Sequence, residues 1–159
     1  MNNEEAVELS MMVGMALGGS ITSFSKWDRK NYFYPDLPKG YQISQYDKPL
    51  CTGGQVAFPC GDDTCSVRIT RAHLEEDTGK STHVGGGGRI HEAGYSLVDY
   101  NRAGVPLIEI VGAPDLRSAE EARSYVGELR AILVAIGASD GKMEAVSYTH
   151  LTLPTILLV

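Results

Sequence analysis

Cysteine, excess positive charge and long apolar runs are all scarce in this chain of 159 residues. The three cysteines, Cys51, Cys60 and Cys65, form an odd number without Cys-x-x-Cys spacing, so we predict neither a zinc site nor a disulfide framework. Reduced thiols of this kind are typical of the cytosol. No apolar run reaches the roughly 18 residues of a membrane span, and the acidic start MNNEEAVELS is unlike a signal peptide. We therefore expect a cytoplasmic protein that makes no membrane contact.

The charge balance limits the partners of the chain. A formal net charge of −6 argues against this chain gripping nucleic acid by itself, because phosphate binding depends on clustered Lys and Arg. A local cationic patch remains compatible with that total, and its candidates are Lys26, Arg29, Lys30 and Lys39. The length corresponds to one domain or to a piece of a larger one, since domains run to about 100–200 residues.

Two amphipathic helices are predicted, one near each end of the chain. Asn2 followed by Glu5 forms a capping box ahead of an apolar stripe that a pair of glycines ends. Ser118 and Glu121 form a second capping box, and another glycine ends that helix. Between the two helices, residues 51–65 are predicted to form a hairpin around the turn-rich Gly-Asp-Asp sequence.

The segment Val98–Val111, VDYNRAGVPLIEIV, places the carboxylate of Glu109 in an otherwise apolar strand. A run this apolar predicts a strand that is buried on both faces. An ionised carboxylate in such a place costs several kcal/mol unless a cation or several donors meet it. Glu109 is therefore predicted to meet a metal ion or an arginine, with Arg102 the nearest in sequence. A purely structural Glu–Arg pair is the alternative.

A second group of charged side chains follows a strand that alternates over residues 67–74. Its members are Arg71, His73, Glu75, Glu76 and Asp77, with Lys80 shortly after. Carboxylates beside cations are what a Mg²⁺–nucleotide site requires. Alternation puts Glu76 on the face of Ala72 and Leu74, opposite Glu75, so only one of the two glutamates points into a site. Glu76 and Glu109 would form a metal pair if their strands are adjacent; a solvated strand end with ion pairs is the alternative.

Two further patterns carry less information. Residues 27–50 concentrate tyrosine, proline and charge, which is compatible with a recognition surface or with a packed loop. The sequence Gly79-Lys80-Ser81 is not a phosphate-binding P-loop, because Leu74 stands where the pattern requires its first glycine. Composition and spacing by themselves therefore lead no further than a Mg²⁺-dependent site on a sheet.

Three long segments in this order resemble a known family. They are KNYFYPDLPKGYQISQYD (Lys30–Asp47), ITRAHLEEDTGKSTH (Ile69–His83) and SLVDYNRAGVPLIEIV (Ser96–Val111). They are similar to the B subunit of the aspartyl/glutamyl-tRNA amidotransferase, the GatB family. The resemblance also takes in the first helix and the SDGKME segment at Ser139–Glu144, and it covers about nine-tenths of the chain.

The resemblance implies a fold and an activity. The expected fold is α+β, part of a glutamine-synthetase- and guanidino-kinase-like catalytic domain with a mixed or antiparallel sheet and flanking helices. The expected enzyme is a heterotrimeric ligase in which a glutaminase, the A subunit, supplies ammonia and the small C subunit is the third partner. The B subunit would use ATP and Mg²⁺ to phosphorylate the side-chain carboxylate of Asp or Glu misattached to tRNA. Ammonia would then give Asn-tRNA or Gln-tRNA.

The resemblance also implies roles for particular residues. Glu76 and Glu109 are expected to bind the metal. Lys30 and Arg71 are expected to act in catalysis by holding the ATP phosphates. Tyr32 and Lys80 are further expected nucleotide-binding residues.

The chain departs from the family at both ends. A first strand carrying a Gly-Leu-Glu-Val-His motif is missing, so we expect a start within a longer gene, and Gly112-Ala113-Pro114-Asp115 replaces the usual Ser-Glu-Pro-Asp. We expect a partial catalytic domain at residues 1–144 and a non-native tail at 145–159, because Val146–Thr155 matches a translated sequencing adapter. The tRNA-holding regions would then be absent. The expected isolated chain is an inactive fragment, and a tRNA- or partner-docking module is the other alternative.

Overall fold

The computed structural model describes residues 3–85 and 94–141, and this part of the chain has two helices and antiparallel strands. In chain order the elements are α1 (Glu4–Ala16), β1 (Ser20–Ile21), β2 (Asp28–Asn31), β3 (Tyr41–Ser44), β4 (Cys51–Thr52), β5 (Gln55–Cys60), β6 (Asp63–Glu76), β7 (Lys80–Val84), β8 (Tyr95–Asp99), β9 (Pro106–Gly112) and α2 (Ala119–Ala135). The predicted α+β class with an antiparallel sheet and flanking helices is confirmed. The expected tail at 145–159 lies outside the described residues.

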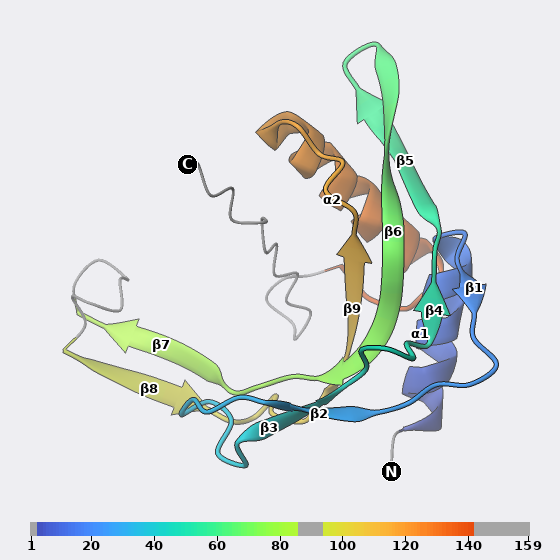
Figure 1. Ribbon diagram of the computed structural model, residues 1–159. Helices are drawn as coiled ribbons and strands as arrows, with labels where there is room; N and C mark the ends of the chain where they lie inside the picture. Colours follow the sequence, from blue (N-terminus) through green and yellow to red (C-terminus); the bar gives the residue numbers. More distant parts are fainter. Residues whose placement is uncertain (1–2, 86–93, 142–159) are drawn as a thin grey trace, which may run out of the picture.

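The long strand β6 organises the main sheet (Figure 1), in which the strand order is β1-β4-β6-β5 and β9 also pairs with β6. The first half of β6 forms a hairpin with β5, from Cys60 opposite Asp63 to Gln55 opposite Arg68. Its second half lies between β4 and β9. The two halves of one strand therefore have different neighbours.

Both helices pack on one face of this sheet, behind β6 in the view of Figure 1. Apolar side chains from α1, β5, β6 and α2 form the core between them: Val13, Leu17, Val56, Phe58, Val67, Ile69, Tyr125 and Leu129. The amphipathic stripes of the helices and the alternating strands meet there because burial removes their apolar surface from water. The opposite face of the sheet is left for polar side chains.

A β-bulge lies in the middle of β6, where the register with β9 shifts between Ile69 and Arg71. Before the bulge, Val67 and Ile69 point into the core. After it, Leu74 stands opposite Ile108, which packs against the same core. An extra residue at a bulge reverses the alternation that strict pleating would give. Odd-numbered residues of β6 therefore face the core before the bulge and the other face after it.

The prediction that the Glu109 strand is buried on both faces is wrong. No residue of β9 is fully buried, and the Glu109 side chain is 44% exposed. Among the described residues β9 pairs only with β6, so it has a sheet neighbour on one side alone. Its Ile108 and Ile110 cover the core, and the alternate residues face the other way.

Two separate ribbons, β2–β3 and β7–β8, lie at the end of the sheet where β6 finishes (Figure 1). The β2–β3 ribbon contacts β6 through hydrogen bonds, including one from the backbone N–H of Ile43 to the Glu76 carboxylate at 2.7 Å. The tyrosine-rich segment thus forms short strands joined by ordered turns. Neither helix of the described residues is both long and apolar enough to cross a membrane.

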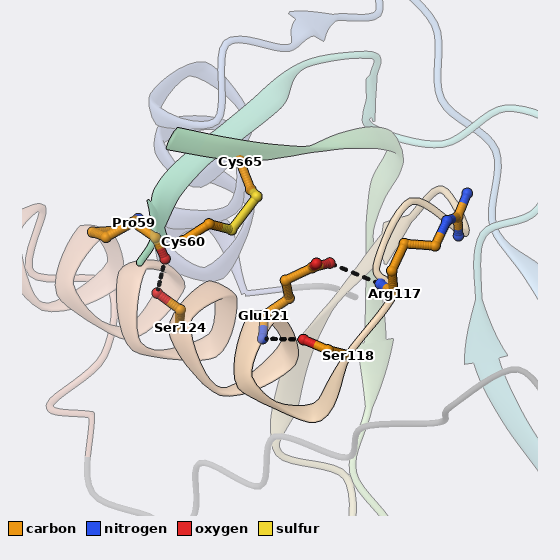
Figure 2. Close-up of a disulfide and its surroundings, with 7 residues drawn as sticks. All are labelled: Pro59, Cys60, Cys65, Arg117, Ser118, Glu121 and Ser124. Atoms are coloured by element: carbon orange, nitrogen blue, oxygen red, sulfur yellow. Dashed lines mark hydrogen bonds between the residues drawn. A yellow bond between two sulfur atoms is a disulfide. The ribbon is translucent and has the colours of Figure 1, made fainter. Parts of the chain in front are cut away.

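The β5–β6 hairpin is closed by a disulfide between Cys60 and Cys65 (Figure 2), so the prediction of three reduced thiols is wrong. The two-residue turn places the cysteines on facing strands with their Cα atoms 5.6 Å apart, within the range a disulfide spans. Cys51 alone is a free thiol, and it is buried. Beside the disulfide, the Ser124 hydroxyl of α2 donates to the Pro59 carbonyl at 2.7 Å.

The helix caps follow the sequence closely. The first helix is capped by Asn3, whose side chain accepts from the Glu5 N–H, rather than by Asn2 as predicted. The Ser118 hydroxyl accepts from the Glu121 N–H at 3.1 Å, as predicted for α2. The Glu121 carboxylate accepts in return from the N–H of the residue before the cap, at 2.7 Å (Figure 2). This satisfies donors that a helix start leaves without intrahelical partners.

Candidate functional site

A buried imidazole and two carboxylates converge on the sheet face opposite the helices. His73 and Glu75 come from β6 and Glu109 from β9, and one ligand atom of each lies within 4.8 Å of the others. The His73 Nε2 atom is 3.4 Å from an oxygen of Glu75 and 3.4 Å from an oxygen of Glu109. We call these three residues the His73 cluster.

Strand register builds this cluster. His73 stands directly opposite Glu109 in the β6–β9 pair, so their side chains emerge on the same face. Glu75 is two residues further along β6 and shares that face. The bulge before His73 is what directs these residues away from the core, because unbroken alternation from Ile69 would point them into it.

The β2–β3 ribbon covers Glu75 with hydrogen-bond donors. Its carboxylate accepts from the Ser44 hydroxyl at 2.7 Å, from the Gln42 amide at 3.3 Å and from the Lys30 ammonium at 3.4 Å. Only 7% of the Glu75 side chain is exposed. The burial of this charge is tolerated because several donors and a cation replace the lost water.

Contacts within the cluster outweigh burial in shifting the pKa values of Glu75 and His73. Burial by itself raises the pKa of Glu75, but hydrogen bonds from His73 and Ser44 and the charge of Lys30 outweigh burial and lower that pKa. Burial lowers the pKa of His73, whereas Glu109 and Glu75 outweigh this and raise it above its ordinary value. The contact between His73 and Glu75 therefore raises one pKa and lowers the other, as a hydrogen bond between an imidazole and a carboxylate does.

Arg71 fixes the orientation of the imidazole. Its Nε–H donates to His73 Nδ1 at 3.4 Å, so Nδ1 is the accepting nitrogen. The proton of the neutral ring then lies on Nε2, which faces the two carboxylates. In this arrangement His73 orients Glu75 and Glu109, and the carboxylate oxygens are the atoms left to bind a cation.

The cluster opens into a hollow of about 770 Å³ beside the β2–β3 ribbon. Both cations and anions line it, and the lining residues are Lys26, Asp28, Arg29, Lys30, Ser44, Gln45, Tyr46, Asp47, Arg71, His73, Glu75 and Glu109. Three of the four members of the predicted cationic patch are among them. Cations beside carboxylates suit a ligand that carries phosphate groups and a divalent cation.

Three of the residues assigned from the sequence line this hollow. Lys30 lies beside Glu75, Arg71 beside His73, and Glu109 completes the cluster. Glu109 is predicted to meet a metal ion or Arg102, but its side chain lies beside His73 at 3.4 Å, whereas Arg102 lies 3.5 Å from a carboxylate oxygen of Asp77. The metal role of Glu109 and the phosphate roles of Lys30 and Arg71 stay predictions.

The other three assigned residues lie outside the hollow. Glu76 stands opposite Pro106 in the β6–β9 register, three residues from Glu109 along β9, and its carboxylate meets Lys39 and the Ile43 N–H rather than the His73 cluster. The Tyr32 hydroxyl lies 3.4 Å from the Asp36 carboxylate. Lys80 begins β7 and is exposed. Their nucleotide or metal roles remain predictions that the geometry of the hollow does not support.

Sequence reasoning passed over His73 and Glu75 as site residues. Both stand in the charged group after residue 70, but the choice between Glu75 and Glu76 depends on the bulge. Strict alternation from the core residues Val67 and Ile69 would send residue 75 into the core and residue 76 to the open face. The β-branched Thr70 at the bulge gives no clear sequence signal for the reversal.

The donor set fits a hard divalent cation. Mg²⁺ takes oxygen ligands and uses one or two carboxylates together with water and phosphate oxygens. Glu75 and Glu109 supply such carboxylates, and the half-exposed Glu109 leaves room for a phosphate-bearing ligand. The second group of metal-ligating types in the described chain contains two sulfurs that are bonded to each other, and its members are Cys60, Cys65 and Glu121.

Comparison with known proteins adds the family. The sequence model of the GatB/GatE catalytic domain matches residues 1–148. The B subunit of the aspartyl/glutamyl-tRNA(Asn/Gln) amidotransferase of Frankia casuarinae is 59% identical over 143 residues, which cover 89% of this chain and 28% of that protein. The same subunit of Nocardia farcinica is 57% identical, and that of Moorella thermoacetica is 55% identical, each covering 89% of this chain and 29% of the relative. The chain thus spans about three-tenths of these relatives. It belongs to the GatB/GatE catalytic-domain family.

Proposed function

We propose that this chain is part of the B subunit of a tRNA-dependent amidotransferase and carries its ATP- and Mg²⁺-dependent centre. The parent enzyme would convert Asp-tRNA(Asn) and Glu-tRNA(Gln) into Asn-tRNA(Asn) and Gln-tRNA(Gln), as a carbon–nitrogen ligase that uses glutamine as amide donor. The observation that carries the proposal is the His73 cluster, set in a hollow rimmed by Lys26, Arg29, Lys30 and Arg71. The similarity to relatives bearing this enzyme's name supports it.

The chemistry explains why such a site needs both charges. A carboxylate is a poor acyl donor, because its oxygen is a poor leaving group. Phosphorylation gives an acyl phosphate, from which ammonia can displace phosphate. Phosphoryl transfer depends mainly on positioning and on charge stabilisation of the phosphate oxygens.

Within this scheme the residues of this chain would hold the phosphates and the metal ion and would orient the two carboxylates. Lys30 and Arg71 would neutralise phosphate oxygens at the rim, since each reaches the cluster from its own strand. Glu75 and Glu109 would hold Mg²⁺, which would supply charge neutralisation for the phosphate oxygens. His73 would keep the two carboxylates in place through its Nε2 hydrogen.

The remaining features of the parent enzyme are part of the same proposal. They are a glutaminase partner that is the source of ammonia, a further small partner, a cytoplasmic location and a glutamine-synthetase-like catalytic fold. Misacylated tRNA would be held mainly by parts of the B subunit that this chain does not include. The antiparallel sheet with an open polar face is compatible with that fold.

Substitution of Glu109 by Gln in a full-length B subunit, in complex with its partners, tests the function. We expect ATP-dependent amidation of Asp-tRNA and Glu-tRNA to be lost, while glutamine hydrolysis continues, because only the carboxylate charge of the kinase centre has changed. Glu8→Gln, at an exposed position of α1, is the matched control and should keep both activities. Unchanged amidation in the Glu109 variant would remove the His73 cluster from the reaction.

A further inference from the structure

Tyr46 is a large ring at the edge of the hollow, and 74% of its surface is exposed. It follows β3 by two residues and lines the hollow together with Arg71 and Glu109. A single exposed aromatic residue is common on protein surfaces and carries no meaning by itself. Two further observations distinguish Tyr46.

The backbone around Tyr46 is anchored on both sides. Gln45 is 1% exposed, and its side-chain oxygen accepts from the N–H groups of Leu50 and Leu74, each at 3.2 Å. On the other side, Asp47 is paired with Lys26 at 2.7 Å. The ring is therefore presented to solvent from a fixed backbone, which reduces the entropy lost when it binds a ligand.

Arg71 connects this ring to the His73 cluster. Its guanidinium carbon lies 5.5 Å from the centroid of the Tyr46 ring, while its Nε–H donates to His73. The guanidinium covers one face of the tyrosine, and the opposite face and edge remain available to a planar ligand. A ligand with its phosphates at the cations would thus meet an aromatic surface directly beyond Arg71.

We propose that Tyr46 stacks against the adenine ring of the ligand whose phosphates lie at the His73 cluster. This inference rests on the proposed function and adds a positioning residue to it. Stacking on an aromatic side chain suits adenine because the base offers a large π face. Two adenine-bearing ligands share this chemistry: ATP, and the terminal adenosine that carries the amino acid in an aminoacyl-tRNA.

Binding to the 159-residue chain in the presence of Mg²⁺ tests the inference. Isothermal titration calorimetry would measure the dissociation constants of ATP, inorganic tripolyphosphate and the trinucleotide CCA. Each ligand would be titrated into Tyr46→Ala, Tyr46→Phe and the starting chain. We expect Tyr46→Ala to weaken ATP binding roughly 5- to 100-fold, the usual effect of losing one base stack. Tyr46→Phe should stay within about 2-fold, because it keeps the ring. Tripolyphosphate has no base and should bind all three proteins equally.

Two further variants control for indirect effects. Phe24→Ala removes a ring that is also exposed but does not line the hollow, and it should leave ATP binding unchanged. Tyr46→Leu keeps an apolar side chain without a π face, and it should weaken ATP binding as Tyr46→Ala does. Circular dichroism of each variant confirms that the fold is retained.

The outcomes separate this inference from the function on which it rests. A loss confined to ATP identifies the nucleotide as the stacked ligand, and a loss confined to CCA identifies the tRNA end; either supports the inference. Equal ATP and CCA binding by the Ala, Leu and starting proteins, with tripolyphosphate still bound, overturns the inference and leaves the proposed function intact. Failure of tripolyphosphate and ATP to bind any of these proteins contradicts the proposed phosphate site, and the inference with it.

Discussion

The two halves of β6 differ in what surrounds them. Before the bulge, the strand pairs with β5, and its inward side chains contribute to the apolar core under α2. After the bulge, it lies between β4 and β9, and it presents His73 and Glu75 to a polar hollow. One strand therefore contributes to the core at one end and lines the hollow at the other. The bulge at Ile69–Arg71 decides which side chains of β6 face the hollow, so the two halves should respond differently to substitution.

The largest effect is expected in the first half, from Phe58→Ala. Phe58 is 2% exposed and makes an edge-to-face contact with Tyr125 at 5.7 Å between ring centroids. Removing the ring leaves a cavity, which should cost about 3–5 kcal/mol of unfolding free energy. Urea unfolding measures this loss. Phe33→Ala is the matched control, because Phe33 is exposed and its removal should change stability little. Equal losses in both variants would mean that the core does not lie where the structure places it.

The hairpin disulfide should contribute next. Replacing both Cys60 and Cys65 by Ser should lower the unfolding free energy by about 2 kcal/mol, because a short loop in the unfolded chain is released. ATP and Mg²⁺ binding should not change, since neither cysteine lines the hollow. Thiol titration of the denatured, unreduced protein should detect one thiol, that of Cys51. The same titration after reduction should detect three thiols. Three thiols before reduction would contradict the bridge.

In the second half, Ser44→Ala removes the shortest hydrogen bond to Glu75, at 2.7 Å. A buried carboxylate loses one donor, so we expect a cost of about 1–2 kcal/mol in urea unfolding. The pKa of Glu75 should rise, because the hydroxyl stabilises its charged form. Ser66→Ala, at an exposed position of β6, is the control and should be neutral. A neutral Ser44 variant would show that the ribbon does not hold Glu75.

The smallest effect is expected at the surface pair of Arg68 and Asp115. Arg68 donates from Nε and Nη2 to the two carboxylate oxygens, at 2.9 and 2.7 Å, and its side-chain and backbone hydrogen bonds lower the pKa of Asp115 to about 2. A lowered carboxyl pKa stabilises the fold above the ordinary value of 3.8 and loses this contribution as pH falls towards 2. The melting temperature of Arg68→Gln should therefore fall below that of the starting protein at pH 6, and the gap should close towards pH 2. A constant gap would contradict the pair.

Much of the fold follows from local sequence signals. The Ser118 capping box and the hairpin turn are short-range patterns, and the structure has both where they are predicted. The position of β9 is also predicted correctly, but its burial is not. Burial depends on how many neighbours a strand has, and that information lies in segments distant along the chain.

The site is predictable only in part for the same reason. Lys30, Arg71 and Glu109 reach the hollow from three strands, and their charges mark them in the sequence. The sequence favours Glu76 over Glu75 only if alternation continues through Thr70. A bulge arises from the pairing of β6 with β9, which a single strand does not reveal. The disulfide escapes prediction because its signal lies in the hairpin geometry and not in a cysteine motif.

Mn²⁺ titration of the chain, with Mn²⁺ as a spectroscopic substitute for Mg²⁺, tests the central claim most directly. Electron paramagnetic resonance would measure the Mn²⁺ affinity of Glu75→Gln, Glu109→Gln and Glu76→Gln. Each of these three variants removes one negative charge. We expect the Glu75 and Glu109 variants to bind Mn²⁺ at least about tenfold more weakly, because each removes a ligand. The Glu76 variant should bind Mn²⁺ unchanged. Loss of Mn²⁺ binding in Glu76→Gln together with full Mn²⁺ binding in Glu75→Gln would contradict the proposed metal role of Glu75.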